Sequence, residues 1–184
     1  VSFVVRARVT LLRDLGSALA PDNAFGIIQG LETVALRMKQ HCSNAEKTVE
    51  YLSKHKNIAR VIYPTKYDGE IGKRAKKYLK GGYGGLVGIE LKGGIEAGKK
   101  FIEALKMFYH VANIGDARSL AIHPGSTTHS QLNEKELLAA GVTPGYVRLA
   151  IGIEHIDDII EDLEQALDRT SHNIENIKKA KAVG

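Results

Sequence analysis

The sequence contains no tryptophan and only one cysteine, Cys42, among its 184 residues. A single thiol cannot form an internal disulfide framework or a zinc site with several thiolate ligands, so both are excluded. One cysteine also fits a reducing compartment, and we expect a cytoplasmic protein. No apolar run approaches the roughly 20 residues that a membrane-spanning helix needs, so we expect no membrane partner.

The chain also lacks an initiating methionine and a secretory leader. Residues 1–5 are apolar, but they have neither the basic start nor the cleavage pattern of a signal peptide. We therefore expect Val1 to be an internal position of a longer protein. With 43% hydrophobic and 26% charged residues, the chain has the composition of a soluble globular protein and the length of one domain.

The net charge of +5 raises the question of nucleic-acid binding, but the distribution of the charges disfavours it. The lysines are spread over predicted helices, where a run of charge is usually a solvated face. No phenylalanine or tyrosine alternates with a basic stripe, as a stacking platform for bases would require. We expect no nucleic-acid partner.

Hydrophobic periodicity predicts helical segments first and then strands that alternate with helices. Helices are expected over residues 4–15, 24–55, 70–79, 95–105, 133–140 and 157–168. Pro21 opens the second of these regions, and Ser43 and Asn44 are the expected place of a kink. Strands are expected over residues 57–63, 86–91, 107–112, 120–122 and 147–151. Three or four strands with helices over one face make an α/β domain of two layers.

Residues 115–132 bring two histidines, five Ser/Thr hydroxyls, an arginine and an aspartate into one short segment. Only Leu120, Ala121 and Ile122 are consecutively apolar, which suits a short buried strand that His123-Pro124 ends. A strand that leads into a polar loop is a common way to line a site. The alternative is a surface loop that caps the helix beginning near Asn133.

Arg148 lies inside the apolar run 147–151, where an unpaired charge would be costly. The carboxylate of an amino-acid substrate could bind its guanidinium through two parallel hydrogen bonds. The alternatives are a structural ion pair with an Asp or Glu of the same domain, or an edge strand that points the arginine at water. The residues alone favour these alternatives.

Motifs spread along the chain resemble the Cys/Met-metabolism family of pyridoxal-phosphate (PLP) enzymes, from Val4 to Arg169. In the second half these are Ser119-Leu120, His123-Pro124, Thr128-His129, Arg148 and Gly152-Ile153-Glu154. In the first half they are Arg13-Asp14-Leu15-Gly16, Asn23-Ala24-Phe25, Gln29-Gly30-Leu31-Glu32-Thr33 and Leu36-Arg37-Met38. Each motif is short, but their number and order are hard to explain by chance.

The resemblance implies the carboxy-terminal domain of a fold-type-I PLP-dependent transferase, a small and mostly antiparallel sheet with helices on one face. Residues 1–55 would be an interdomain helical segment that includes a long helix, and residues 56–184 the α/β substrate-binding domain. The cofactor would be PLP, bound mainly by an amino-terminal domain absent from this chain. The family also implies a homotetramer.

The resemblance assigns substrate binding to Arg148, which would hold the α-carboxylate, and to Ser119. Arg118, Thr128 and His129 are candidates for a loop beside the site. The arginine at position 118 makes this segment resemble the sulfhydrylases of the family, because cystathionine synthases and lyases usually carry a glutamate at this position. No metal site is expected, since His123 and His129 have no thiolate or carboxylate nearby in sequence to complete a zinc shell.

The chain departs from the family in having no Ser-x-Thr-Lys, the context of the lysine that holds PLP. We therefore expect no catalytic residue in this chain and an inactive protein when it is alone. The resemblance implies part of an O-acetylhomoserine sulfhydrylase, which converts O-acetylhomoserine and sulfide to homocysteine for methionine biosynthesis. The alternatives are a cystathionine synthase or lyase, a methionine lyase, or a non-catalytic domain that assembles with a partner chain.

Overall fold

The computed structural model describes residues 1–127, 131, 134–139 and 141–182. The chain divides into two compact units, Val1–Leu36 and Arg37–Gly184. In the part of the chain that the structure describes, none of the helices has the length and hydrophobicity needed to cross a bilayer.

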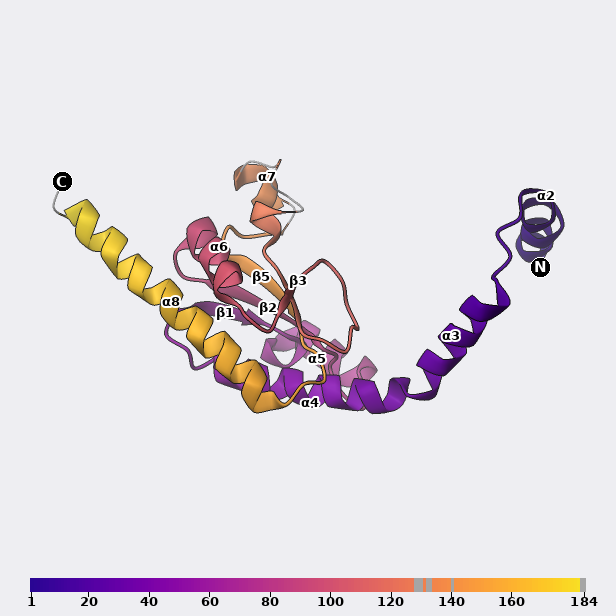
Figure 1. Ribbon diagram of the computed structural model, residues 1–184, viewed down its shortest axis with the longest axis horizontal. Coiled ribbons are helices and arrows are strands. Elements are labelled where there is room, and N and C mark those ends of the chain that lie inside the picture. Colours follow the sequence, from indigo (N-terminus) through magenta and orange to yellow (C-terminus); the bar gives the residue numbers. More distant parts are fainter. Residues whose placement is uncertain (128–130, 132–133, 140, 183–184) are drawn as a thin grey trace. The chain divides into compact units, whose positions relative to one another are not determined.

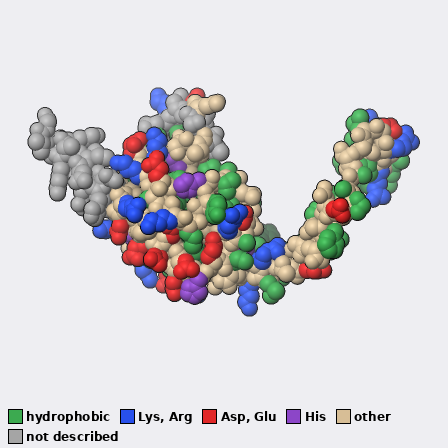
Figure 2. Space-filling model, viewed as in Figure 1, with side chains coloured by type: hydrophobic (Ala, Val, Ile, Leu, Met, Phe, Trp, Pro, Cys, Tyr) green, Lys and Arg blue, Asp and Glu red, His purple; other side chains and the backbone are tan. Residues whose placement is uncertain are grey.

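The first unit is helical, as the sequence predicted, and carries many exposed apolar side chains (Figure 2). Its elements are α1 (Ser2–Arg6), a π-helical segment (Ala7–Leu12), α2 (Arg13–Leu15) and α3 (Pro21–Glu32). Gly16 ends the first helical region with a φ of 88°, which suits glycine. Pro21 then stands at the start of α3, where its missing N–H costs nothing.

The long helix α4 (Val34–Leu52) is separated from α3 at Thr33 and runs unbroken through Ser43 and Asn44, so the helix is not broken in two there. Asn44 favours a bend only when its side chain competes for the backbone of its own helix. Here the Asn44 amide instead donates to the carbonyl oxygens of Gly152 and Glu154, at 3.0 and 2.9 Å.

The second unit is built on a five-stranded sheet with the order β1-β2-β5-β4-β3. Its strands are β1 (Ile58–Ile62), β2 (Leu86–Leu91), β3 (Tyr109–His110), β4 (Leu120–Ile122) and β5 (Tyr146–Ala150). All neighbours are antiparallel except β3 and β4. Helices α5 (Gly69–Tyr78), α6 (Gly94–Ala104), α7 (Glu134–Ala139) and α8 (Ile156–Ala182) alternate with these strands (Figure 1).

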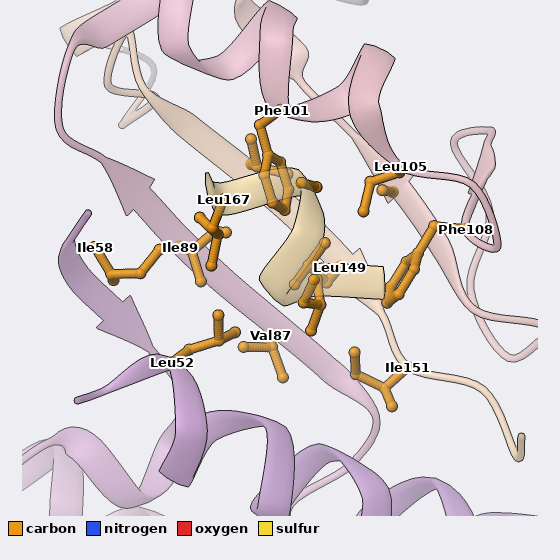
Figure 3. Close-up of a cluster of buried hydrophobic side chains, with 14 of the residues drawn as sticks. Leu52, Ile58, Val87, Ile89, Phe101, Leu105, Phe108, Leu149, Ile151 and Leu167 are labelled. Carbon is orange, nitrogen blue, oxygen red and sulfur yellow. The ribbon is translucent and has the colours of Figure 1, made fainter. Parts of the chain in front are cut away.

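The core lies on one face of this sheet, beneath α4, α6 and α8. Val87 of β2 pairs with Leu149 of β5, and both side chains are fully buried. Figure 3 shows apolar side chains from α4, α6 and α8 directed at these strands, among them Leu52, Phe101 and Leu167. The predicted fold class, a small and mostly antiparallel sheet with helices packed on it, is confirmed.

Strand β3 is shorter than the predicted strand over residues 107–112. The backbone N–H groups of Lys106, Met107 and Phe108 donate to the Asp162 carboxylate of α8, at 2.9, 2.8 and 3.3 Å. Amides that bind a side chain in this way cannot also pair with a neighbouring strand.

The compact sheet unit begins at Arg37, whereas the sequence placed the start of the α/β domain at residue 56. The reason is the second half of α4, whose Ala45, Val49 and Leu52 are buried in the core. The sequence identified this stretch as helical, but its burial depends on contacts with distant strands.

Leu149→Ala should lower the free energy of unfolding by about 2–5 kcal/mol, because it leaves a cavity in the centre of the core. Leu36→Ala is the matched control, since Leu36 is 72% exposed, and should change stability by about 0.5 kcal/mol or less. Urea unfolding followed by circular dichroism measures both. Equal losses for the two variants would contradict this position of the core.

Candidate functional site

Arg148 projects from the sheet face opposite the core. It pairs with Gly88 of β2 and Ile122 of β4, while its neighbours Val147 and Leu149 point into the core. A strand places successive side chains on opposite faces, so the buried Leu149 requires Arg148 to face outward. The apolar run around Arg148 therefore belongs to a strand that is buried on its core face.

The Arg148 guanidinium is only partly satisfied by the residues that the structure describes. One Nη donates to the carbonyl oxygen of Asn113 at 3.3 Å. The Nε atom is buried and has no hydrogen-bond partner among the described residues. Among those residues no carboxylate lies within 4.0 Å of the guanidinium, so the structural ion pair considered above is not found there. A buried N–H donor without an acceptor is costly and favours a ligand that supplies one.

Two hollows border the sheet near β5, and Arg148 lines the first of them. One, of about 470 Å³, lies between α5 and the sheet and is lined by Arg148, Tyr67, Arg74 and Tyr146 with apolar neighbours. The other, of about 480 Å³, is lined by Ala150 of β5 and by Ile114 and Gly115 of the loop before β4, among others.

Gly88, opposite Arg148, leaves room for the Tyr146 side chain. A Cβ atom there would lie 2.8 Å from Cε2 of Tyr146. Burial raises the pKa of Tyr146, so its phenol stays neutral at physiological pH. The Tyr146 side chain next to Arg148 is therefore aromatic and uncharged.

Ser119 is fully buried just before β4, in a closed hydrogen-bond network with Glu154. Its backbone N–H donates to Oε1 of Glu154 at 2.6 Å, and its hydroxyl donates to Oε2 at 2.9 Å. The Ser119 oxygen in turn accepts the N–H of Gly152 at 2.9 Å. Because its only hydroxyl proton is already donated, Ser119 could donate to a substrate carboxylate only by leaving Glu154.

The segment 151–154 is held in place by buried polar side chains of α4. Asn44 donates to the carbonyl oxygens of Gly152 and Glu154, and Nδ1 of His41 lies 2.6 Å from the carbonyl oxygen of Ile151. Sequence reasoning missed both roles. The signal available was that these polar residues share the buried side of α4 with Ala45 and Leu52, where a polar group needs a partner.

Arg118 lies at the exposed end of the loop before β4. Its guanidinium stacks on the ring of Tyr109, 4.2 Å from the centroid, and its Nε lies 3.6 Å from an Asp116 oxygen. The hydrogen bond that Asp116 accepts from the Arg118 N–H, with the nearby positive charge, lowers the pKa of this carboxyl. Arg118 is thus placed beside β3, where its contacts are with Tyr109 and Asp116.

His123 is a buried hydrogen-bonding residue, as the sequence predicted. Its Nδ1 lies 2.8 Å from the Ser126 hydroxyl and its Nε2 lies 2.9 Å from the Pro144 carbonyl oxygen. A carbonyl only accepts, so Nε2 carries the proton and Nδ1 accepts from Ser126. Thr128 and His129 lie outside the described residues, so their predicted place beside the site stays a prediction. Among the residues described, no group of three or more potential ligands could hold a metal ion.

Comparison with known proteins identifies the family to which the chain belongs. The family model described as Cys/Met metabolism PLP-dependent enzyme matches residues 3–168. The chain belongs to this family, as its motifs predicted.

The relatives include the O-acetyl-L-homoserine sulfhydrylase of Leptospira meyeri, 54% identical over 168 residues that cover 91% of this chain and 38% of that protein. The L-methionine gamma-lyase of Fusobacterium nucleatum subsp. polymorphum is 45% identical over 86% of this chain and 40% of its own length. The chain thus spans about two fifths of the curated relatives it matches.

The fold matches a crystal structure from Campylobacter jejuni, described as an O-acetylhomoserine (thiol)-lyase, with a TM-score of 0.82 and 45% identity. The match covers 91% of this chain and 40% of that one, which carries N'-pyridoxyl-lysine-5'-monophosphate.

Stability should depend on the pH through His123. Burial lowers its pKa, against the smaller opposite effect of the hydrogen bond to Pro144. The unfolded chain binds this proton near the ordinary pKa of about 6.5, whereas the folded chain binds it only at lower pH. The free energy of unfolding should therefore fall as the pH drops below about 6.5 and level off below the lowered pKa.

His123→Gln should remove this part of the pH dependence, because glutamine does not titrate. His110→Gln, at an exposed position, should leave it unchanged. Urea titrations between pH 8 and pH 5 would measure the slopes. A slope that is the same with and without His123 would contradict the assignment.

Proposed function

We propose that this chain is the substrate-carboxylate-binding part of a PLP-dependent O-acetylhomoserine sulfhydrylase. The complete enzyme would exchange the acetate on Cγ of O-acetylhomoserine for sulfide, breaking a C–O bond and forming a C–S bond to give homocysteine. The observation that carries the proposal is Arg148, whose buried Nε has no acceptor among the described residues and whose side chain lines the hollow between α5 and the sheet. The relatives named as sulfhydrylases support the substrate.

The residues of this chain fit the substrate carboxylate better than they fit the cofactor. Arg148 offers the planar pair of donors that a carboxylate binds best, in a partly dry site. The sequence has no Ser-x-Thr-Lys, so the lysine that holds PLP would come from another part of the enzyme. When bound there, PLP would withdraw electrons from the substrate so that acetate can leave. Arg148 would fix the carboxylate end and so orient the carbon chain.

Ser119 and the loop residues take secondary roles in this proposal. The Ser119 hydroxyl is committed to Glu154, so Ser119 would act by placing the start of β4 beside the substrate. The exposed cation of Arg118 would suit a sulfide anion better than a thiol that carries an amino group. The alternative within the family is a methionine lyase, which the Fusobacterium relative supports. Assaying product formation from methionine and from O-acetylhomoserine plus sulfide would separate the two.

We further propose that residues 1–55 connect this domain to an amino-terminal PLP domain in a homotetramer. The exposed apolar side chains of the first unit, such as Phe3, Leu15 and Phe25, support a surface that becomes covered. Cys42 is a free thiol, which fits a cytoplasmic location.

Arg148→Lys in the complete enzyme should lower kcat/KM for O-acetylhomoserine by about 30-fold or more, or about 2 kcal/mol, because a lysine keeps the charge and loses the two-pronged hydrogen bond. PLP content and thermal stability should stay near normal. Arg60→Lys is the control, since Arg60 is an exposed strand arginine paired with Glu90 at 3.7 Å. Loss of PLP or stability with normal kcat/KM would show that Arg148 is a structural residue.

The 184-residue chain alone should not bind PLP covalently at one specific lysine. The experiment is to mix the chain with PLP, reduce it with borohydride, remove free reagent by gel filtration and map any modified lysine by mass spectrometry. Scattered, partial labelling of surface lysines is the expected result. Complete labelling of a single lysine, such as Lys66 after Thr65, from a complex that is yellow before reduction, and its loss in Lys66→Arg, would contradict the proposal.

A further inference from the structure

The loop between β3 and β4, residues 111–119, contributes an acceptor that contacts Arg148. Asn113 lies in this loop, and its carbonyl oxygen accepts the Arg148 Nη–H at 3.3 Å. The loop is mostly exposed and contains no helix or strand. The direction of the guanidinium therefore depends on how the ends of this loop are fixed.

Both ends of the loop are held by hydrogen bonds close to Glu154. Tyr109 donates its N–H to the carbonyl oxygen of Ser119 at 3.0 Å, which closes the loop on itself. Ile153 donates its N–H to the carbonyl oxygen of Ala117 at 2.9 Å. Glu154 accepts both the N–H and the hydroxyl of Ser119, so its two carboxylate oxygens hold one residue at two points.

Glu154 is itself fixed from the other side. Its carbonyl oxygen accepts from the buried Asn44 of α4 at 2.9 Å, and Asn44 also holds Gly152. Gly152 lies too close to the loop for any side chain, since a Cβ atom there would lie 2.5 Å from the Ala117 oxygen and 2.6 Å from the Arg118 carbonyl carbon. A series of hydrogen bonds thus runs from α4 through Glu154 to the loop and on to Arg148.

A carboxylate suits this position better than an amide does. Its oxygens only accept, and the Ser119 N–H and hydroxyl both donate to them. A glutamine has only one accepting oxygen, so either the Ser119 N–H or the Ser119 hydroxyl proton would lose its acceptor. Replacing Glu154 by Gln should therefore shift the loop without opening a cavity.

We propose that Glu154 is a positioning residue, which fixes the loop 111–119 and thereby aims Arg148 at the α-carboxylate of the amino-acid substrate. This inference rests on the carboxylate-binding role proposed for Arg148. Replacing a residue that only stabilises the fold would weaken the binding of all ligands alike. Replacing a residue that orients Arg148 should weaken the binding only of ligands with a carboxylate.

The test compares L-norvaline with butylamine, the same molecule without its carboxylate, in the complete PLP-loaded enzyme. Binding of each is followed by the change in cofactor absorbance. Glu154→Gln should weaken L-norvaline binding by about 10-fold, or about 1.4 kcal/mol, and change butylamine binding by less than about twofold. Glu50→Gln, on the exposed face of α4 with its partner Lys54 at 3.0 Å, is the control and should change neither.

A double variant tests whether Glu154 acts through Arg148. Once Arg148→Lys has removed the two-pronged hydrogen bond, adding Glu154→Gln should weaken L-norvaline binding by less than about twofold more, because the two residues share one effect. A full further 10-fold loss would overturn the inference. Should Glu154→Gln fail to fold, Glu154→Asp keeps the charge but cannot reach both donors, and it should shift L-norvaline binding in the same direction by a smaller factor.

The outcomes separate this inference from the proposed function. If Arg148→Lys changes the preference for L-norvaline over butylamine and Glu154→Gln does not, the role of Glu154 alone is overturned. An unchanged preference in Arg148→Lys would overturn both. Equal weakening of both ligands by Glu154→Gln would make Glu154 a structural residue and overturn the inference.

Discussion

The alternation of side chains along β5 is the constraint on which the second unit depends. Leu149 enters the core under α4, α6 and α8, and Arg148 is thereby directed to the opposite face. A slip of one residue would bury the guanidinium among apolar side chains and expose the leucine, so the hydrophobic core also fixes the register. Packing energy on one face of the sheet thus determines where the charge stands on the other.

Much of the fold could be predicted because its signals are local. The run 86–91 predicted a strand, the periodicity of 157–168 predicted the first part of α8, and Pro21 marked the start of α3. The incorrect predictions arise where a residue distant in the sequence determines the local structure. The Asp162 carboxylate accepts hydrogen bonds from amides that would otherwise have extended β3. The segment 151–154 accepts hydrogen bonds from the Asn44 side chain, which could otherwise have bent α4. Sequence periodicity contains no information on such pairings across 50 to 110 residues.

The candidate site was predictable as a set of residues and not as an arrangement. The family motifs named Arg148 and Ser119, and Arg148 does lie on an open face. The motifs did not indicate that the Ser119 hydroxyl would be engaged by Glu154, although both residues belong to quoted motifs. Their contact is between two loops 35 positions apart, so only the folded chain reveals that the two motifs form one unit.

Gly152 shows how the contact between these two motifs constrains the divergence of related sequences. Any side chain at this position would meet the backbone of Ala117 and Arg118 as well as the Glu154 carboxylate. A substitution becomes tolerable only where the facing loop has already moved, and such a loop would no longer present the same donors to Glu154. The two segments are therefore expected to change together or not at all, although they are far apart along the chain.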